Sequence, residues 1–200
     1  MFQGKAAICA WVDIAADEQQ DFREWHNREH LPERLALPGF NRGRRFVAID
    51  GAPQFLFLYE VDGIEVLHSA EYAQRYDNPT PWTALNTARF RNLVRGLFTL
   101  RGSAGSGNGG FLATLQATVA AGEGDLAAAA LAGIADLPGC LACHALAGEA
   151  DAIVLIEASS LESLREACGR AAQALPRDVA PRIGFYALEA ALERVEIRGG

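Results

Sequence analysis

Eight short stretches, in which apolar residues alternate with polar ones or form an unbroken run, predict β-strands. Longer segments between them, where apolar residues recur at helical spacing, predict helices. The predicted strands cover residues 6–14, 41–50, 53–61 and 93–101 in the first half, and 111–120, 140–148, 152–159 and 182–192 in the second. The predicted helices cover residues 17–37, 65–91 (broken near the prolines of DNPTP), 126–137 (capped by Asp125) and 161–175.

Both halves have the same order of elements, β-α-β-β-α-β, which is the ferredoxin-like arrangement. The tetrapeptide LPGF (residues 37–40) ends the first helix of one half, and LPGC (residues 137–140) ends its counterpart. The predicted fold class is therefore α+β, with two tandem ferredoxin-like units. Residues 1–101 form the unit that carries the candidate site, and residues 111–200 form a second, degenerate unit.

The segment RGSAGSGNGG, which ends the first half, contains Gly105, Gly107 and Gly110 at G-x-G-x-x-G spacing. A dinucleotide-binding loop of that kind must lead directly into a helix. The sequence that follows, FLATLQATVA, has the alternation of a strand. Residues 102–110 are therefore predicted to be a flexible Gly/Ser linker.

Charge and composition exclude several classes of function. The chain has 18 basic and 25 acidic residues, a net charge of −7, which argues against nucleic acid as a partner. No apolar run approaches the ~20 residues of a membrane span, and no secretory signal pattern stands at the start. Four cysteines are too few for a disulfide scaffold. The expectation is a cytoplasmic protein that does not bind membranes.

The two halves differ in their chemistry. Of the 17 aromatic residues, 14 lie within residues 1–101, as do three of the four histidines. The first half has 12 basic and 13 acidic residues, whereas the second has 6 and 12. We therefore expect the site in the first half, with the second half as a structural partner.

The helix predicted over residues 17–37 carries the most informative polar residues. At 100° per residue, one arc is predicted to face the sheet; it contains Phe22, Trp25, Pro32, Leu35 and Ala36. Glu29 falls within this arc, His26 at its edge and His30 slightly further round. A carboxylate on a buried face must be paired or protonated, so Glu29 is either a catalytic group or the partner of Arg42 or Arg44. Pro32 is expected to bend or end the helix near His30.

Two motifs resemble metal or haem sites. His26-Asn27-Arg28-Glu29-His30 matches the zinc-peptidase pattern H-x-x-E-H, but the proline after it distorts the required helix, and such a peptidase also needs a third ligand from a distant helix and room for a substrate cleft. Residues 140–144, CLACH, match the covalent haem pattern. In a strand, however, Cys140 and Cys143 would point to opposite faces, which favours two buried apolar side chains. We therefore expect no metal and no cofactor.

Further candidates lie outside that helix. Strand alternation puts Arg42 and Arg44 on one face and Arg45 on the other, so that an arginine could bind a carboxylate or enolate oxygen. Tyr59, late in the third strand, and Tyr76 are candidate cavity residues. Asn78 and Trp82, four positions apart, are candidate ligand contacts, although the two prolines between them mean that their side chains need not converge.

Four segments together resemble EthD-like proteins of the dimeric α+β barrel superfamily: WHNREHLPER, LPGF with RGRRF, QFLFLYE and YAQRYDNPTPW. The resemblance covers roughly residues 5–101. It implies two ferredoxin-like sheets packed face to face into a barrel, here within one chain, with a ligand cavity between sheet and helices. Members of this superfamily include cofactor-free monooxygenases, isomerases, cyclases and haem enzymes, so that the fold alone does not select the function.

The leading hypothesis is a small-molecule enzyme without metal or organic cofactor. Glu29 or His30 would act as general acid or base, and Arg44 would stabilise an enolate-like oxygen. The substrate would be a small aromatic or lactone-like compound that undergoes isomerisation, cyclisation or oxygenation. Its contacts would be Trp25, His26, Arg42, Tyr59, Tyr76, Asn78 and Trp82. The alternatives are a non-catalytic binding protein of the same fold and a zinc enzyme that uses His26 and His30. A homodimer is an open option.

Overall fold

The computed structural model describes residues 1–118, 131–176 and 179–194. The first half begins with strand β1 (Ala6–Asp13) and a helical segment in three parts: α1 (Gln19–Trp25), the single π-helical turn η1 (His26–His30) and α2 (Leu31–Leu35). Strands β2 (Phe40–Asp50) and β3 (Phe55–Val61) follow as a hairpin. The short 3₁₀ helix η2 (Ile64–His68), helices α3 (Ala70–Asp77) and α4 (Pro81–Ala88) and the long strand β4 (Arg91–Gly105) complete the half.

The second half contains β5 (Phe111–Thr118), β6 (Cys140–Ala147), β7 (Asp151–Ala158), α6 (Leu161–Ala174) and β8 (Arg182–Glu193). Residues 119–130, and with them Asp125 and the first part of the helix predicted over 126–137, lie outside the described residues. The remainder of that segment forms successive turns, in which the N–H of Ile134 bonds to the carbonyl of Leu131. No helix of the described part is long and apolar enough to cross a membrane.

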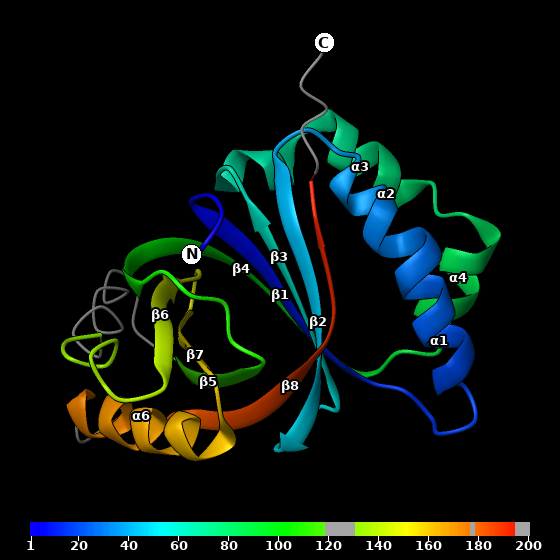
Figure 1. Cartoon of the computed structure of the whole chain (residues 1–200). Helices are drawn as coiled ribbons and strands as arrows, with labels where there is room; N and C mark the ends of the chain where they lie inside the picture. Colours follow the sequence, from blue (N-terminus) through cyan, green and yellow to red (C-terminus); the bar gives the residue numbers. More distant parts are fainter. Residues whose placement is uncertain (119–130, 177–178, 195–200) are drawn as a thin grey trace, which may run out of the picture.

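The eight strands of the described residues close into one barrel, in the order β1-β3-β2-β8-β5-β7-β6-β4 (Figure 1). Around the barrel, the strands of each half are neighbours and have the same relative order, β4-β1-β3-β2 and β8-β5-β7-β6. The halves join along two antiparallel seams, β2 with β8 and β4 with β6. The predicted mixed α+β fold is confirmed.

The described residues form three apolar clusters, because each strand presents alternate residues to opposite faces. The barrel interior forms one cluster, around Trp11, Phe46 and Tyr186. Helices α1 to α4 cover the outer face of β1 to β3, and α6 covers the outer face of β5 to β7, as Figure 1 shows. The aromatic residues concentrate in the cluster under α1 to α4, which is where the sequence placed the site.

Strand β4 is longer than the sequence predicted, and it includes the start of the predicted Gly/Ser linker. Gly102 pairs with Ala145, and Gly105 pairs with Ala142, so residues 102–105 belong to the seam with β6. The linker prediction is therefore wrong for these four residues, and residues 106–110 alone connect β4 to β5. Composition could not show this, because the backbone of β6 supplies the hydrogen bonds that order a glycine-rich strand.

The CLACH segment lies in β6, as predicted. Cys140 and Cys143 are both buried and free, and both belong to the cluster under α6. The prediction that they face opposite ways is wrong. A bulge between Cys140 and Ala142 adds a residue to the strand, which breaks the two-residue alternation.

Candidate functional site

A cavity of about 180 Å³ lies between the sheet of the first half and its helices. We call it the sheet–helix cavity. Strands β1, β3 and β4 form its floor, and the helical segments form its roof. Its lining residues are Ile8, Ala10, His30, Arg34, Phe57, Tyr59, Tyr72, Tyr76, Thr87, Phe90, Leu93 and Arg95. Tyr76 and Leu93 are 60% and 52% exposed, so they mark its mouth.

The roof of the cavity contains the π-helical turn His26–His30. Pro32 has no N–H with which to continue the α-helical ladder, and just before it the N–H of Leu31 bonds to the carbonyl of His26, five residues back. The extra residue in this turn rotates everything that follows. Leu31 is therefore buried, and Pro32 and Ala36 are exposed. The prediction for an uninterrupted α-helix, that Pro32 and Ala36 are buried, is wrong. Phe22, Trp25 and Leu35 are buried as predicted.

His30 lies in the cavity wall, with its ring centroid 4.5 Å from that of Trp25. Removal from water lowers the pKa of His30 to about 3, and the positive charge of Arg34 acts in the same direction. His30 is therefore a neutral imidazole at physiological pH, with a free proton-accepting nitrogen. This is the protonation state that a general base needs before it reacts.

His26 is completely buried behind the cavity wall. Its Nε2 lies 3.1 Å from the hydroxyl of Tyr59, whose ring lines the cavity. Burial lowers the pKa of His26 well below its usual value and raises the pKa of Tyr59. Both groups are therefore neutral, and Tyr59 is held in place by an internal partner.

Gly43 of β2 provides the space that Tyr59 occupies. A Cβ atom at this position would lie 2.9 Å from Cδ1 of Leu31 and 3.0 Å from Cδ1 of Tyr59. We expect Gly43→Val to lower the free energy of unfolding by about 1–3 kcal/mol through overpacking, and to displace Tyr59 from His26. Chemical denaturation and the His26 NMR signals would measure the two effects. Gly110→Val, where a Cβ meets nothing within 4 Å, is the matched control; equal losses in both variants would contradict the explanation.

Two arginines of the cavity wall, Arg34 and Arg95, were not among the residues predicted from sequence. The guanidinium of Arg34 lies over the ring of Tyr72, 5.2 Å from its centroid. Arg95 donates a hydrogen bond to the hydroxyl of Tyr72 at 2.7 Å. The position of Arg34, four residues after His30, is the signal that could have identified it, because these positions share a face of a helix.

Glu29 is only partly exposed, but it does not line the cavity. Its carboxylate accepts hydrogen bonds from the hydroxyls of Thr80 and Thr83, the latter at 3.0 Å. Thr83 in turn accepts a hydrogen bond from the indole N–H of Trp25 at 3.1 Å. In this structure Glu29 therefore joins the π-helical turn to the N-terminus of α4.

Arg42 and Arg44 lie on the same face of β2, as predicted, but that face is the barrel interior rather than the cavity. Both donate to the buried Glu60, and Arg44 also forms an ion pair with the buried Glu157 at 2.9 Å. Glu157 has a pKa lowered to about 2 because His144, Arg44 and the N–H of Gly109 stabilise its charge against the cost of burial. Neither arginine is paired with Glu29.

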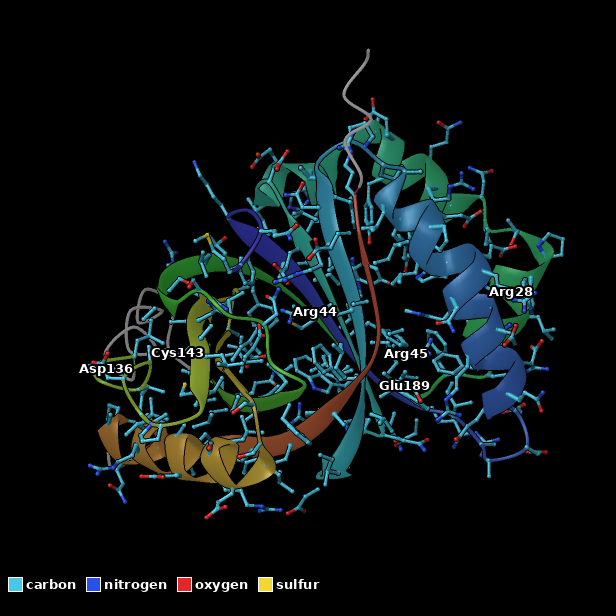
Figure 2. All side chains as sticks on the ribbon, in the orientation of Figure 1. Arg28, Arg44, Arg45, Asp136, Cys143 and Glu189 are labelled. Carbon is cyan, nitrogen blue, oxygen red and sulfur yellow. The ribbon has the colours of Figure 1, made fainter. Side chains whose placement is uncertain are left out.

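Arg45 projects from the other face of β2, as the alternation predicted. Its Nε forms an ion pair with Glu189 of β8 at 2.6 Å, close to the helical layer (Figure 2). Arg23 of α1 bonds to the same carboxylate at 2.7 Å. The charge of Arg45 is therefore compensated outside the cavity.

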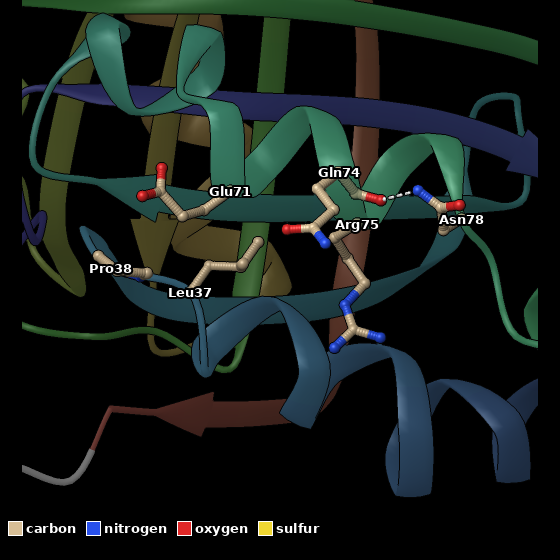
Figure 3. A pocket seen from close by; sticks show the side chains of 6 residues that line it. All are labelled: Leu37, Pro38, Glu71, Gln74, Arg75 and Asn78. Atoms are coloured by element: carbon tan, nitrogen blue, oxygen red, sulfur yellow. Dashed lines mark hydrogen bonds between the residues drawn. The ribbon is translucent and has the colours of Figure 1, made fainter.

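Asn78 and Trp82 do not converge on one place. Asn78 lines an open groove of about 400 Å³ between the end of α2 and helix α3, where its side chain donates to the carbonyl of Gln74 at 2.8 Å (Figure 3). Arg75 of the same groove is paired with Glu33. Trp82 packs on the helical cluster and donates to Asp21 of α1 at 3.1 Å. Of the predicted ligand contacts, Tyr59 and Tyr76 line the cavity, and Trp25 and His26 support it.

The residues of the H-x-x-E-H motif are not arranged as a metal site in the described part of the chain. The rings of His26 and His30 have centroids 5.7 Å apart, but Nε2 of His26 is engaged by Tyr59 and Glu29 by two threonines. Among the described residues, no group of three or more His, Cys, Asp or Glu side chains could hold a metal ion.

No protein-family profile matches this chain, and no curated protein matches its sequence. Solved structures do match over nearly its whole length. An anthrone oxidase-like protein superposes with a TM-score of 0.60 at 13% identity, covering 96% of this chain and 93% of that one. A candidate monooxygenase from Fusobacterium nucleatum has a TM-score of 0.60 at 6% identity, covering 96% and 95%. A heme-binding protein from Thermus thermophilus has a TM-score of 0.56 at 9% identity, covering 93% and 90%.

These neighbours are dimeric α+β barrel proteins, and at such low identity the likeness shows that this chain has their fold. Because one of them binds haem, the sheet–helix cavity has to be compared with that group. His30 offers a neutral imidazole, which is a ligand that haem iron accepts. The cavity, at about 180 Å³, is smaller than the ~300–1,000 Å³ that is typical of ligand and cofactor pockets. It therefore does not fit a haem in this structure, and no step is assigned to one.

Proposed function

We propose that the sheet–helix cavity is the site of a small-molecule enzyme that uses acid/base chemistry and no organic cofactor. The observation that carries the proposal is His30, a neutral imidazole on a π-helical turn in the wall of an aromatic cavity. Single π-helical turns occur frequently at functional sites. The names of the anthrone oxidase-like and monooxygenase neighbours are consistent with oxygenation as one reaction class.

In this proposal His30 accepts a proton from a C–H or O–H bond of the bound ligand, and the ligand is left as an enolate or phenolate. The aromatic walls exclude water, which strengthens every electrostatic interaction in the cavity. Tyr59 orients the ligand and is itself held by His26. Glu29 positions the π-helical turn through Thr80 and Thr83 rather than touching the ligand. Arg44 does not line this cavity, so the proposal gives it no catalytic role.

We also propose that the chain consists of two tandem ferredoxin-like units of an EthD-like protein. The repeated strand order supports duplication, and two buried glutamates correspond. Glu60 of β3 accepts from the N–H of Gln3, just before β1, and Glu157 of β7 accepts from the N–H of Gly109, just before β5. The cavity position of WHNREHLPER supports the EthD-like assignment. A cytoplasmic location and a homodimer remain predictions.

One observation favours a second candidate function, a binding protein without turnover. A histidine whose pKa is about 3 is a weak base, and proton transfer is most efficient when the pKa lies near the working pH. Such a protein would use the same cavity and the same aromatic contacts.

Two probes test the proposal: α-angelica lactone, whose isomerisation requires loss of a proton next to a carbonyl, and hydroquinone, whose oxidation consumes oxygen. We expect turnover of at least one, and a decrease in kcat/KM of roughly 10²- to 10⁴-fold in His30→Gln. His68→Gln is the matched control, because His68 is exposed and lies outside the cavity. Binding of these probes without turnover would favour the binding protein, and turnover that persists in His30→Gln would refute the assignment of His30.

A further inference from the structure

We propose that the sheet–helix cavity selects an anionic ligand, a single aromatic ring bearing a carboxylate or phenolate oxygen, through Arg34, with Arg95 at the mouth. The inference deepens the proposed function and rests on its choice of cavity. It does not depend on whether the bound ligand reacts.

The charge of the cavity wall is the first observation. The described residues that line it include two arginines and no acidic residue, although the protein as a whole has a net charge of −7. Opposite charges attract most strongly where water is least accessible, so this wall favours an anion over a neutral molecule of the same shape, chiefly through the partly buried Arg34 rather than the exposed Arg95. The remaining lining is almost entirely apolar or aromatic, which leaves the arginines as the dominant source of charge.

The second observation is that the guanidinium of Arg34 is not paired with an acidic side chain of the described residues. Among the described residues, its buried Nη1 has no hydrogen-bond partner, and no acidic side chain forms an ion pair with it. Nearby arginines of the helical layer differ, because Arg75 is paired with Glu33, and Arg23 with Glu189. An uncompensated guanidinium in a cavity wall carries a desolvation cost that a ligand anion would relieve.

Tyr72 organises the two arginines. The guanidinium of Arg34 lies over its ring, 5.2 Å from the centroid, and Arg95 donates to its hydroxyl at 2.7 Å. The ring is in turn stacked on Phe40, with centroids 5.8 Å apart and planes inclined by 18°. Phe40 is buried in the core, so this stack holds the ring of Tyr72 in place under the guanidinium of Arg34. A planar oxyanion binds best to a guanidinium whose orientation is already fixed.

The volume of the cavity and its aromatic walls indicate the size and the chemical character of the uncharged part of the ligand. An apolar protein cavity of ~150 Å³ accommodates a benzene molecule, so about 180 Å³ suits one aromatic ring with a small substituent. Phe57, Tyr59 and Phe90 provide ring faces for such a group. Together, walls and charge indicate an aromatic ring with one anionic oxygen group.

The experiment compares benzoate with benzamide, its neutral analogue of nearly the same shape, by isothermal titration calorimetry at pH 7 and low salt. We expect benzoate to bind roughly 10- to 100-fold more tightly than benzamide. Arg34→Met should abolish this preference, Arg34→Lys should retain part of it, and Arg95→Met should reduce it. Arg75→Met, an arginine of the neighbouring groove, is the matched control that should leave it unchanged.

Leu93→Trp tests the place of binding, because a large side chain at the mouth should obstruct benzoate as well as benzamide. Circular dichroism spectra establish that each variant folds. If Arg34→Met does not fold, Arg34→Lys and Arg95→Met decide the outcome. Equal affinity for the two probes, or a preference that survives in both Arg34 variants, would overturn the inference.

The inference and the proposed function fail separately. Turnover that depends on His30, combined with no preference for benzoate, would retain the function and reject the anion site. A preference that depends on Arg34, combined with no turnover of any probe, would retain the anion site and reject the enzyme.

Discussion

Replacement of Arg44 by methionine is expected to lower the free energy of unfolding by about 3–5 kcal/mol at pH 7. Arg44 is 2% exposed and contacts the carboxylates of Glu60 and Glu157 at 2.8 and 2.9 Å. The apolar side chain of methionine would leave two buried carboxylates without this shared cation. Their negative charges would then have to be tolerated in a region of low dielectric constant, which is the large cost of a broken buried ion pair.

The matched control is Arg28→Met. Arg28 lies on the outer side of the helical layer, far from the interior position of Arg44 (Figure 2), and its ion pair with Glu24 is largely exposed. Surface pairs of this kind contribute ~0–1 kcal/mol, so the control should unfold at almost the denaturant concentration of the unsubstituted protein. Chemical denaturation at pH 7 measures both variants. Similar losses in the two would show that the interior network does not stabilise the barrel in the way its geometry indicates.

Acidification from pH 7 to pH 5 is expected to lower the free energy of unfolding through both His26 and His30, by about 2 kcal/mol for His30 alone. The pKa of His30 falls to about 3 in the folded protein, and that of His26 falls well below its usual value. The unfolded chain binds protons at these residues below about pH 6.5, whereas the folded protein does not. The contribution of the two neutral histidines to the free energy of unfolding is therefore fully present above that pH. It is lost progressively as the pH falls toward their pKa values in the folded protein.

Denaturant unfolding at half-unit pH intervals between 5 and 8 measures this dependence. His26→Gln and His30→Gln should each remove part of the slope in this window, irrespective of their effect on stability at pH 7. His68→Gln serves as the control, because His68 is exposed. A stability that is independent of pH between 5 and 7 would mean that the two histidines are not held neutral.

Several residues in or behind the cavity wall could be identified from the sequence, three of them because they share one helix. Trp25, His26 and His30 were singled out by their concentration on one helix, and Tyr59 and Tyr76 as aromatic candidates in the richer half. All five lie in or directly behind the cavity wall. Local periodicity sufficed here, since residues on one helical face stay together whatever the helix packs against.

The positions of the Arg34, Arg95 and Glu29 side chains were not predicted from the sequence. Arg95 reaches the cavity because β4 pairs with β1, and Arg34 because the π-helical turn rotates α2. The carboxylate of Glu29 is satisfied by threonines of α4, more than fifty residues away in the chain. The placements of Arg95 and Glu29 depend on contacts between distant segments, which no local pattern shows. Arg34 differs, because its position four residues after His30 is a local signal.

The amino-acid pattern alone was enough to determine the number and order of the strands, the α+β class and the half of the chain that carries the aromatic cavity. These properties follow from periodicity and composition, which act over a few neighbouring residues. Closure of the barrel decided the rest. It placed Arg42 and Arg44 inside rather than in the cavity, because alternation shows which side chains share a face but not which face becomes the interior. The ordering of residues 102–105 has the same origin, since the strand that pairs with them lies some forty residues further along the chain.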